Sequence, residues 1–195
     1  MSRHNNQLVL AVAQLAMSDD PEKNLTRACR LVREAAEREA RVVLLPELFQ
    51  HLYFPRRKSR KPFALASGVK QSRALVVLSE LARELGVVLP LSFFEKKNDS
   101  YFNSVAVVDA DGSIAGIYRK SHLPDGPGYY EKFYFSPSRE GFKAFTTRHA
   151  RLGVAICWDQ WFPETSRAMA LLGAELSLLE LLQVNAQVAL GLGHA

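Results

Sequence analysis

The sequence predicts an α/β fold with a mixed sheet, and three observations lead to this class. Short apolar runs alternate with amphipathic stretches of helical period, as strands and helices do when they share a core. An Asp-Gly turn between two further apolar runs indicates an antiparallel hairpin. With 195 residues, of which 48% are hydrophobic, the chain is long enough for one domain with a full core.

The first strand and the first helix are expected near the N-terminus. Residues 8–15 (LVLAVAQL) read as a strand that is buried on both faces. Asp20 and Pro21 supply the N-cap and the first-turn proline of a helix. The apolar residues of this helix, one cysteine among them, recur at helical spacing and are expected to pack in the core: Leu25, Ala28, Cys29, Val32, Ala35 and Ala36.

Two strands and a second helix follow in alternation. Residues 42–45 (VVLL) read as a short buried strand, and Glu47 stands where the chain leaves the sheet. The second helix is expected over about residues 73–85, with its leucines on one stripe and Gly86 as its stop signal. A strand over residues 87–94 comes next.

The remaining elements include the hairpin. Its arms are expected over residues 104–108 and 114–118, on either side of the Asp-Gly turn. Further strands are expected near residues 142–146 and 152–156, and a helix over about residues 163–173. Helices that alternate with buried strands, together with an antiparallel hairpin, indicate an α/β sandwich with a mixed sheet.

Charge gives little support for a nucleic-acid partner. The formal net charge is +5, and most of the basic residues are scattered along the chain. One basic run has no interleaved aromatic residues, and we interpret it as a solvated loop: Arg56, Arg57, Lys58, Arg60 and Lys61. Nucleic-acid binding through this run is the weakest of the functions that we consider.

The compartment is expected to be the cytoplasm. The two cysteines cannot form a disulfide framework, and there is no CxxC pair to suggest a structural metal site. The apolar stretch after Arg3 resembles the core of a secretory signal, but Gln14 interrupts it, and a buried first strand explains it better. The apolar runs are too short to span a bilayer, so we expect no membrane partner.

Three polar residues stand at the ends of apolar strands: Glu47, Lys120 and Cys157. Strand ends are where α/β folds assemble active sites, because the sheet holds the side chains rigidly at a crevice. A thiolate is favoured beside a lysine or before a helix such as the one expected from residue 163. If Glu47 accepts the thiol proton, Cys157 can attack a carbonyl-type carbon while Lys120 stabilises the oxyanion. A core cysteine beside a structural Glu–Lys ion pair is the equally simple alternative.

Other catalytic patterns are absent from the sequence. There is no GxSxG elbow, no phosphate-binding glycine loop, no GxGxxG after the first strand and no HExxH motif. The five histidines are dispersed without the spacing of metal ligands. His122 lies near the proposed site in sequence, so a Cys–His dyad is a second, weaker possibility.

Three stretches resemble the carbon-nitrogen hydrolase, or nitrilase, superfamily, and within it the branch that hydrolyses N-carbamoylputrescine. They are LLPELF, YRKSHLPDGPGYYEKFYF and GVAICWDQWFPETSRAMALLGAE, at residues 44–49, 118–135 and 153–175. The resemblance extends over about residues 8–175. It implies an α-β-β-α sandwich with mixed sheets.

The resemblance also implies a catalytic apparatus and a reaction. The Glu, Lys and Cys of the family's triad fall on Glu47, Lys120 and Cys157, and a second glutamate that positions the substrate and the lysine falls on Glu131. The implied reaction is hydrolysis of N-carbamoylputrescine to putrescine, carbon dioxide and ammonia. The implied enzyme needs neither a metal nor an organic cofactor, takes a small-molecule substrate and forms homo-oligomers.

Further residues are expected to bind the substrate. Trp158 and Trp161 are expected to wall a pocket that keeps bulk water away from the thiol. The distant ammonium group of the substrate calls for an acid, for which Asp125 and Glu164 are the candidates. Asp125 is also explained as a turn residue, and Glu164 as a first-turn acid that favours the helix dipole.

The resemblance ends after Glu175. We therefore expect residues 1–175 to be the N-terminal two thirds of the domain and residues 176–195 to be a divergent tail, so that the sandwich is incomplete at its C-terminus. Exposing a few hundred Å² of apolar surface costs several kcal/mol at about 25 cal/mol per Å². An inactive remnant of such an enzyme, and a related ureido or amide hydrolase such as a β-ureidopropionase, are the alternatives.

Overall fold

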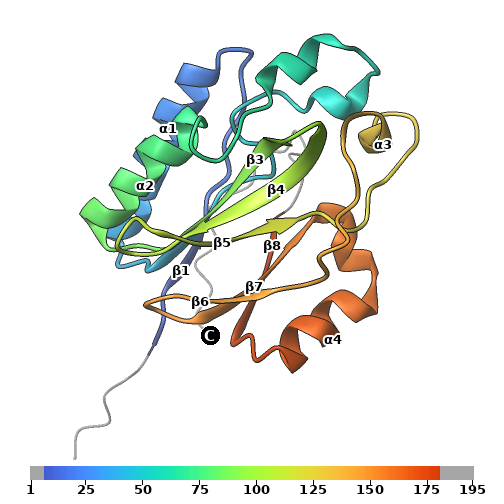
Figure 1. Cartoon of the computed structure of the whole chain (residues 1–195). Helices are drawn as coiled ribbons and strands as arrows, with labels where there is room; N and C mark the ends of the chain where they lie inside the picture. The colour runs from blue at the N-terminus through green and yellow to red at the C-terminus, as the bar shows by residue number, and fades with distance from the viewer. Residues whose placement is uncertain (1–6, 181–195) are drawn as a thin grey trace, which may run out of the picture.

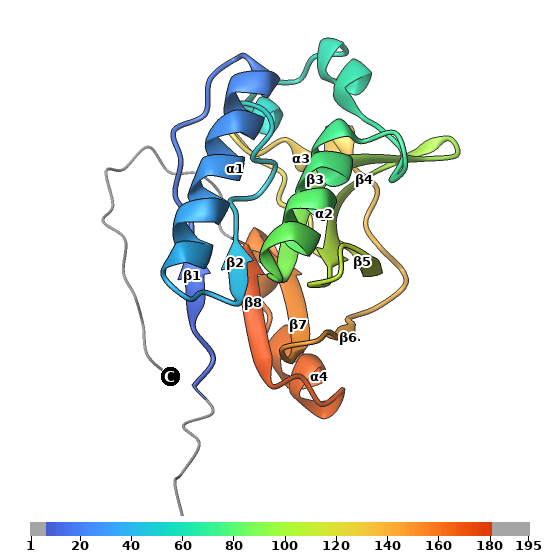
Figure 2. The ribbon, with the colours of Figure 1, turned by 90° about the vertical axis from the view of Figure 1, so that its left-hand side faces the viewer.

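The strands of the molecule form two layers that pack face to face. The computed structural model describes residues 7–180, and Figures 1 and 2 show helices α1 and α2 outside the first layer and α4 outside the second. The order of the layers is therefore helix, sheet, sheet, helix. This confirms the expected α-β-β-α sandwich.

Within residues 7–180 the first layer contains five strands. β1 (Leu10–Val12) pairs in parallel with β2 (Val42–Leu44), and a single parallel bridge links β2 to the residue that precedes β3. β3 (Leu89–Lys97), β4 (Ser100–Val108) and β5 (Ile114–Arg119) form an antiparallel meander. The layer is thus mixed, as expected.

The second layer is a three-stranded mixed sheet. β7 (Arg151–Ile156) lies in the middle, antiparallel to β6 (Ala144–Thr146) and parallel to β8 (Leu176–Glu180). Helix α4 (Pro163–Leu171) packs on β7. The helix packs so closely on β7 that a Cβ atom on Gly153 would lie only 2.7 Å from the sulfur of a methionine of α4.

The two outer helices match their sequence signals. α1 (Pro21–Glu37) begins at Asp20, whose carboxylate accepts hydrogen bonds from two backbone N–H groups of the first turn. α2 (Arg73–Leu85) has the predicted bounds and ends at Gly86 with a φ of 66°, in the left-handed region that glycine adopts without strain. Cys29 is partly buried against the core below α1, as expected.

Two apolar cores hold the layers together. One lies between the two helices and the first sheet, and the other fills the space between the two sheets. A third cluster consists mainly of aromatic side chains and packs beside the loop that leads to α3 (Glu131–Tyr134): Leu48, Phe94, Leu123, Tyr134 and Phe135. This cluster supports the region where the strand ends converge.

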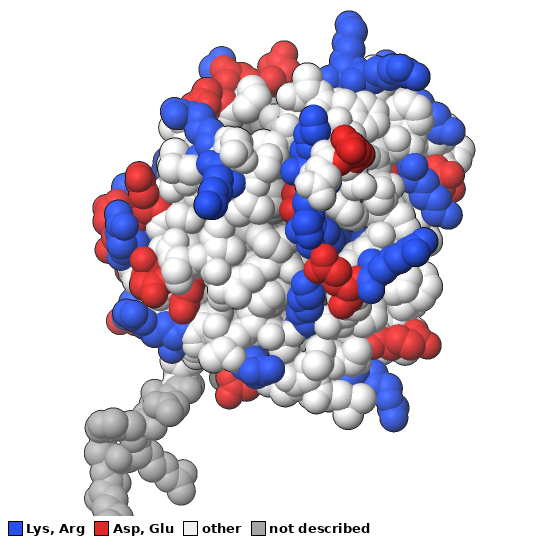
Figure 3. Space-filling view, in the orientation of Figure 1, with Lys and Arg blue, Asp and Glu red and all other residues white. Residues whose placement is uncertain are grey.

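The charged surface has no single sign on the face in Figure 3, where acidic and basic side chains are interspersed. The basic run of residues 56–61 is exposed, as expected, but it is not a simple loop. It overlaps two 3-10 turns, Phe54–Arg56 and Lys61–Leu65, which carry proline near their starts. None of the helices within residues 7–180 is long and apolar enough to cross a bilayer.

One expectation about the strands is wrong, and one hairpin was not expected. The first strand is short, and Val12 is 60% exposed, so it is not buried on both faces. Within the described residues β1 pairs with β2 alone and lies at the edge of its sheet. In addition, β3 and β4 form a hairpin that the sequence analysis does not predict, because charged residues such as Lys96 and Lys97 occupy its tip.

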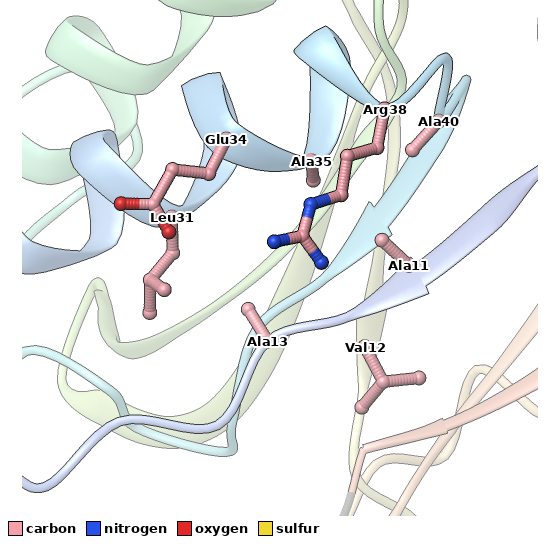
Figure 4. Close-up of a pocket in the computed structure, with 8 residues that line it drawn as sticks. All are labelled: Ala11, Val12, Ala13, Leu31, Glu34, Ala35, Arg38 and Ala40. Atoms are coloured by element: carbon pink, nitrogen blue, oxygen red, sulfur yellow. The ribbon is translucent and has the colours of Figure 1, made fainter. Parts of the chain in front are cut away.

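A small hollow opens where β1 meets α1 (Figure 4). Alanines and Val12 form most of its wall, and Glu34 and Arg38 project from α1. Its volume is about 30 Å³, which is room for a water molecule and not for a substrate. The hollow is therefore too small to be an active site.

Candidate active site

A buried ionic cluster lies where β2, β5 and α3 meet. The Lys120 ammonium nitrogen Nζ lies 2.9 Å from Glu47 Oε1 and 2.8 Å from Glu131 Oε2. All three side chains are fully buried, with 0% of each exposed. The structure therefore brings together two residues of the predicted triad and the second predicted glutamate.

The strand ends place this cluster. Glu47 follows β2, and the next residue, Leu48, has a φ of 51° and donates its backbone N–H to the Ser92 hydroxyl. Lys120 follows β5, and its backbone N–H continues the pairing with β4 through the Asn103 carbonyl at 2.9 Å. The segments that carry Glu47 and Lys120 are thus each fixed by a hydrogen bond from a backbone N–H to a neighbouring strand.

Two more polar side chains complete the cluster. Asn103 Nδ2 donates to Glu47 Oε1 at 2.6 Å, and the Tyr53 hydroxyl donates to Glu131 Oε1 at 2.6 Å. The other carboxylate oxygen of Glu47, Oε2, is buried and has no hydrogen-bond partner among residues 7–180. A buried acceptor without a partner is costly for stability, and such atoms gather at functional sites.

Burial and neighbouring charges shift the titration of this cluster. Burial, and then the negative charge of Glu47, raise the pKa of Glu131 to about 7, although Lys120 opposes the shift. Burial alone would lower the pKa of Lys120, but the charges of Glu47, Glu131 and Cys157 raise it above that of an ordinary lysine. Lys120 is therefore a fixed cation at neutral pH.

Tyr53 is held in its neutral form beside these carboxylates. Burial, followed by the charges of Glu131 and Glu47, raises the pKa of its phenol well above the usual range. The hydroxyl therefore keeps its proton and remains a donor to Glu131. Sequence analysis did not identify this residue, because an aromatic residue in a loop carries no signal of its own.

Cys157 lies at the turn between β7 and α4. It starts a 3-10 turn, Cys157–Trp161, and has a φ of 43°, which places a residue other than glycine in the left-handed region. Such a conformation costs on the order of 1 kcal/mol and is typical of functional turns. Cys157 is half-buried, and its charge is among the causes that raise the pKa values of Lys120 and Tyr53, which places it near the ionic cluster.

The aromatic and acidic candidates lie farther out. Trp158 is 41% exposed and Trp161 is 71% exposed, and their ring centroids are 6.3 Å apart. Trp158 lines an open hollow of about 460 Å³ together with His122, Phe162 and other residues. Asp125 is exposed on the loop between β5 and α3. Their roles toward a substrate stay predictions.

Asn103 is a residue that the sequence analysis could have found. It lies in the middle of the apolar strand β4 and is 1% exposed, yet it is polar. A polar residue at the buried position of a strand either completes a hydrogen-bond network or serves a site. Here it bonds to Glu47, and its own Oδ1 has no hydrogen-bond partner within the described part of the chain.

The ionisable side chains at the site are two glutamates, a lysine and a cysteine. Among the described residues, no group of three or more His, Cys, Asp or Glu side chains is arranged to hold a metal ion. Lys120 occupies the position between the two carboxylates where a cation would bind. The cluster therefore offers a base, a fixed positive charge and a nearby thiol.

Comparison with known proteins agrees with this arrangement. Residues 9–194 match the family model described as carbon-nitrogen hydrolase. An N-carbamoylputrescine amidase of Solanum tuberosum is 51% identical over 176 residues, which are 90% of this chain and 59% of that protein. A citrullinase of Francisella tularensis is 47% identical over 169 residues, which are 87% of this chain and 59% of that protein.

A solved structure supports the same conclusion. The crystal structure of a carbon-nitrogen hydrolase from Helicobacter pylori superposes with a TM-score of 0.83 at 39% identity, over 91% of this chain and 61% of the other. The chain spans about three fifths of the length of the curated relatives that it matches. The extent of the family match and the level of identity show that this chain belongs to the carbon-nitrogen hydrolase family.

Proposed function

We propose that the protein hydrolyses the ureido group of N-carbamoylputrescine to give putrescine, carbon dioxide and ammonia. The observation that carries the proposal is the fully buried Glu47–Lys120–Glu131 cluster with the strained Cys157 turn facing it. The names of the relatives that are about 50% identical support this substrate. Amide hydrolysis by a thiol uses a base, a nucleophile and an oxyanion-stabilising cation.

Glu47 is assigned the role of general base. Its oxygen Oε1 is held by Lys120 and Asn103, so the second oxygen, Oε2, is available to accept the thiol proton. When that proton moves from Cys157 to Glu47, the sulfur bonds to the ureido carbon and the carbonyl electrons move onto oxygen. The proton stays within the site, so the buried cluster gains no net charge, which would be costly in a dry environment.

Lys120 is assigned the stabilisation of the oxyanion. Its charge is permanent at neutral pH, and its position is fixed by two carboxylates, so little reorganisation accompanies the reaction. Collapse of the tetrahedral adduct breaks a C–N bond, and Glu47 returns the proton to the departing nitrogen. A carbamoyl thioester on Cys157 remains.

Water completes the cycle. Glu47 accepts a proton from a water molecule, whose oxygen attacks the thioester carbon and breaks the C–S bond. The same proton then returns to the sulfur, and the carbamic acid that is released breaks its C–N bond to give carbon dioxide and ammonia. Glu131 takes no proton in this scheme and, together with Tyr53, holds Lys120 in place.

Three residues of the outer segments are assigned to substrate binding. Asp125 is assigned to the distant ammonium group, and Trp158 and Trp161 to the wall above the thiol. Trp158 and Asp125 belong to the exposed segments that follow β7 and β5, which supports a position at the outer end of the site.

A second substrate is favoured by a specific observation. The citrullinase of Francisella tularensis is nearly as similar to this chain as the N-carbamoylputrescine amidases are. Citrulline presents the same ureido group to the thiol, but it carries a carboxylate and an ammonium at the other end. Parallel rates on the two substrates, and on N-carbamoyl-β-alanine for the β-ureidopropionase alternative, decide between them.

The partners and compartment remain proposals as well. Two cysteines in a chain of this length cannot form a disulfide framework, which supports a reducing compartment such as the cytoplasm. A homo-oligomer is proposed from the family resemblance. The boundary between residues 1–175 and a divergent tail stays a prediction; β8 includes its first residues, and residues 181–195 lie outside the described part of the chain.

The decisive experiment measures ammonia release by the purified chain from N-carbamoylputrescine. We expect turnover by the wild type and by Cys29→Ala, and a loss of at least 10³-fold in Cys157→Ala, because the nucleophile is absent. Cys29→Ala is the matched control, since it makes the same substitution at the other cysteine of the chain. A folded wild-type chain without turnover on any of the three ureido substrates would instead support an inactive remnant.

A further inference from the structure

Another buried carboxylate, outside the proposed triad, belongs to the turn that carries Cys157. Asp159 is 0% exposed and belongs to the turn that starts with Cys157. Its oxygens accept four hydrogen bonds: from the Tyr118 hydroxyl at 2.7 Å, the His122 backbone N–H at 2.9 Å, the His122 ring Nδ1 at 2.8 Å and the Ile156 backbone N–H at 3.1 Å. A carboxylate that accepts so many bonds is rigidly held.

The donors to Asp159 come from the two segments that carry Lys120 and Cys157. Tyr118 and His122 flank Lys120 on either side in the sequence, and Ile156 immediately precedes Cys157. One side chain therefore ties the end of β5 to the end of β7. These two ends must be held at a fixed separation if the thiol is to face the lysine.

Further contacts make this connection between the ends of β5 and β7 rigid. The ring of His122 stacks on Phe162, with centroids 3.6 Å apart and planes within 10°, and the Thr165 hydroxyl donates to the Asp159 carbonyl at 2.8 Å. Burial, and then the charge of Asp159, raise the pKa of Tyr118 beyond the usual range, so its hydroxyl keeps its proton. The start of α4 is thus anchored to the same point.

We propose that Asp159 is a positioning residue that sets the separation between the Cys157 sulfur and the Lys120 ammonium. It also holds Cys157 in its left-handed conformation, because it binds the backbone N–H of the residue before it. The inference rests on the proposed function of Cys157 and Lys120. Misplacement of a reacting group by about 1 Å can cost on the order of 100-fold in rate.

Thiol alkylation tests the inference without a substrate. The rate at which iodoacetamide modifies Cys157 is measured against pH by peptide mapping, with Cys29 in the same sample as an internal reference. In Asp159→Asn, loss of the negative charge alone would lower the apparent pKa of the Cys157 thiol. Loss of positioning would move the thiol away from Lys120 and raise the pKa toward about 8.5. The two roles therefore predict shifts of opposite sign.

Tyr118→Phe sharpens the test, because it removes one hydrogen bond to Asp159 and leaves every charge in place. We expect a rise in the apparent pKa of the Cys157 thiol in both variants, with a larger rise in Asp159→Asn. On a ureido substrate kcat should fall about 10- to 100-fold in Asp159→Asn and about 3- to 10-fold in Tyr118→Phe, with KM changed less than threefold. Asp99→Asn makes the same chemical change at an exposed turn and should behave as the wild type.

The outcomes separate the two proposals. If Cys157 of the wild type reacts no faster than Cys29 at neutral pH, the proposed function fails, whatever Asp159 does. If it reacts faster, and both variants fold and keep the wild-type pH profile and kcat, the positioning role is refuted. Should Asp159→Asn fail to fold, Tyr118→Phe alone decides, because an unchanged thiol pKa in that variant is incompatible with the inference.

Discussion

Arg119 and Lys120 are consecutive residues at the end of β5, and each holds two glutamates. Side chains of successive strand residues point to opposite faces of the sheet, so the two clusters do not share members. Arg119 bonds Glu95 through two nitrogens, at 2.6 and 2.7 Å, and Glu140 through a third, at 2.7 Å. Each cluster has one cation that holds two carboxylates, but Glu140 also pairs with Lys143, and the two clusters differ in chemistry.

In the Arg119 cluster both carboxylate oxygens of Glu95 accept hydrogen bonds. The planar guanidinium satisfies both oxygens, and Ser104 adds a further donor at 2.7 Å. Lysine instead offers a point charge, and Glu47 keeps a buried oxygen without a partner among residues 7–180. A saturated cluster stabilises the fold, whereas an unsaturated one retains the capacity to accept a proton.

Lys120→Met should have the largest effect. It leaves Glu47 and Glu131 buried without their cation, which costs about 3–5 kcal/mol of unfolding free energy, and it abolishes ureido hydrolysis. Urea unfolding at pH 7, together with the ammonia assay, measures both losses.

The matched control for this variant is Lys70→Met, at an exposed position before α2. We expect it to change stability by less than about 0.5 kcal/mol. If Lys120→Met is as stable as the wild type at pH 7, the charges of Glu47 and Glu131 do not depend on Lys120 for compensation. The proposed difference between the Lys120 and Arg119 clusters would then be wrong.

Glu131→Gln should have an intermediate effect that depends on pH. The pKa of Glu131 is raised from 4.5 to about 7 in the folded protein, so the native state binds this proton more tightly than the unfolded chain. The contribution of the group to stability is fully present below pH 4.5 and is lost as the pH rises through 7, by up to roughly 3 kcal/mol.

The measurement is the difference in unfolding free energy between the wild type and Glu131→Gln across pH 4.5 to 8. The advantage of the wild type over the variant should shrink with rising pH and become constant above about 7. A difference that grows with pH would show that Lys120 dominates and that the Glu131 carboxylate is charged throughout this range.

The helices and the central strands of this fold could be predicted from local signals. Asp20, Pro21 and Gly86 mark helix ends by backbone chemistry that acts within a few residues, and the structure confirms them. The exposed face of β1 could not be predicted, because burial depends on which segments cover a strand and not on its own composition. The hairpin of β3 and β4 was not predicted, because charged residues near its tip interrupt the apolar pattern of both strands.

The site was predictable to the extent that its residues stand at strand ends. Glu47 and Lys120 follow apolar runs, and the geometry brings them together as expected; Glu131 came from the family resemblance alone. Tyr53 and Asp159 could not be found, because their importance arises from contacts with residues distant in the sequence, such as Tyr118. A side chain that only completes a network has no local signature.

Glu140→Gln should have the smallest effect, although its carboxylate also bonds a buried arginine. Its side chain is 41% exposed, and the arginine retains both bonds to Glu95. The hydrogen bond from Lys143, and then the charges of Arg119 and Lys143, hold the pKa of Glu140 below its usual range, so its contribution is present above pH 4.5 and is lost as the pH falls further. Solvent screening limits the loss to less than about 1 kcal/mol, and it should shrink further in 1 M salt. Urea unfolding at low and high salt measures this loss of stability, and the rate of hydrolysis should be unchanged. A loss as large as that of Lys120→Met would show that the Arg119 cluster depends on both of its carboxylates. The difference in exposure would then not explain the difference between the two clusters.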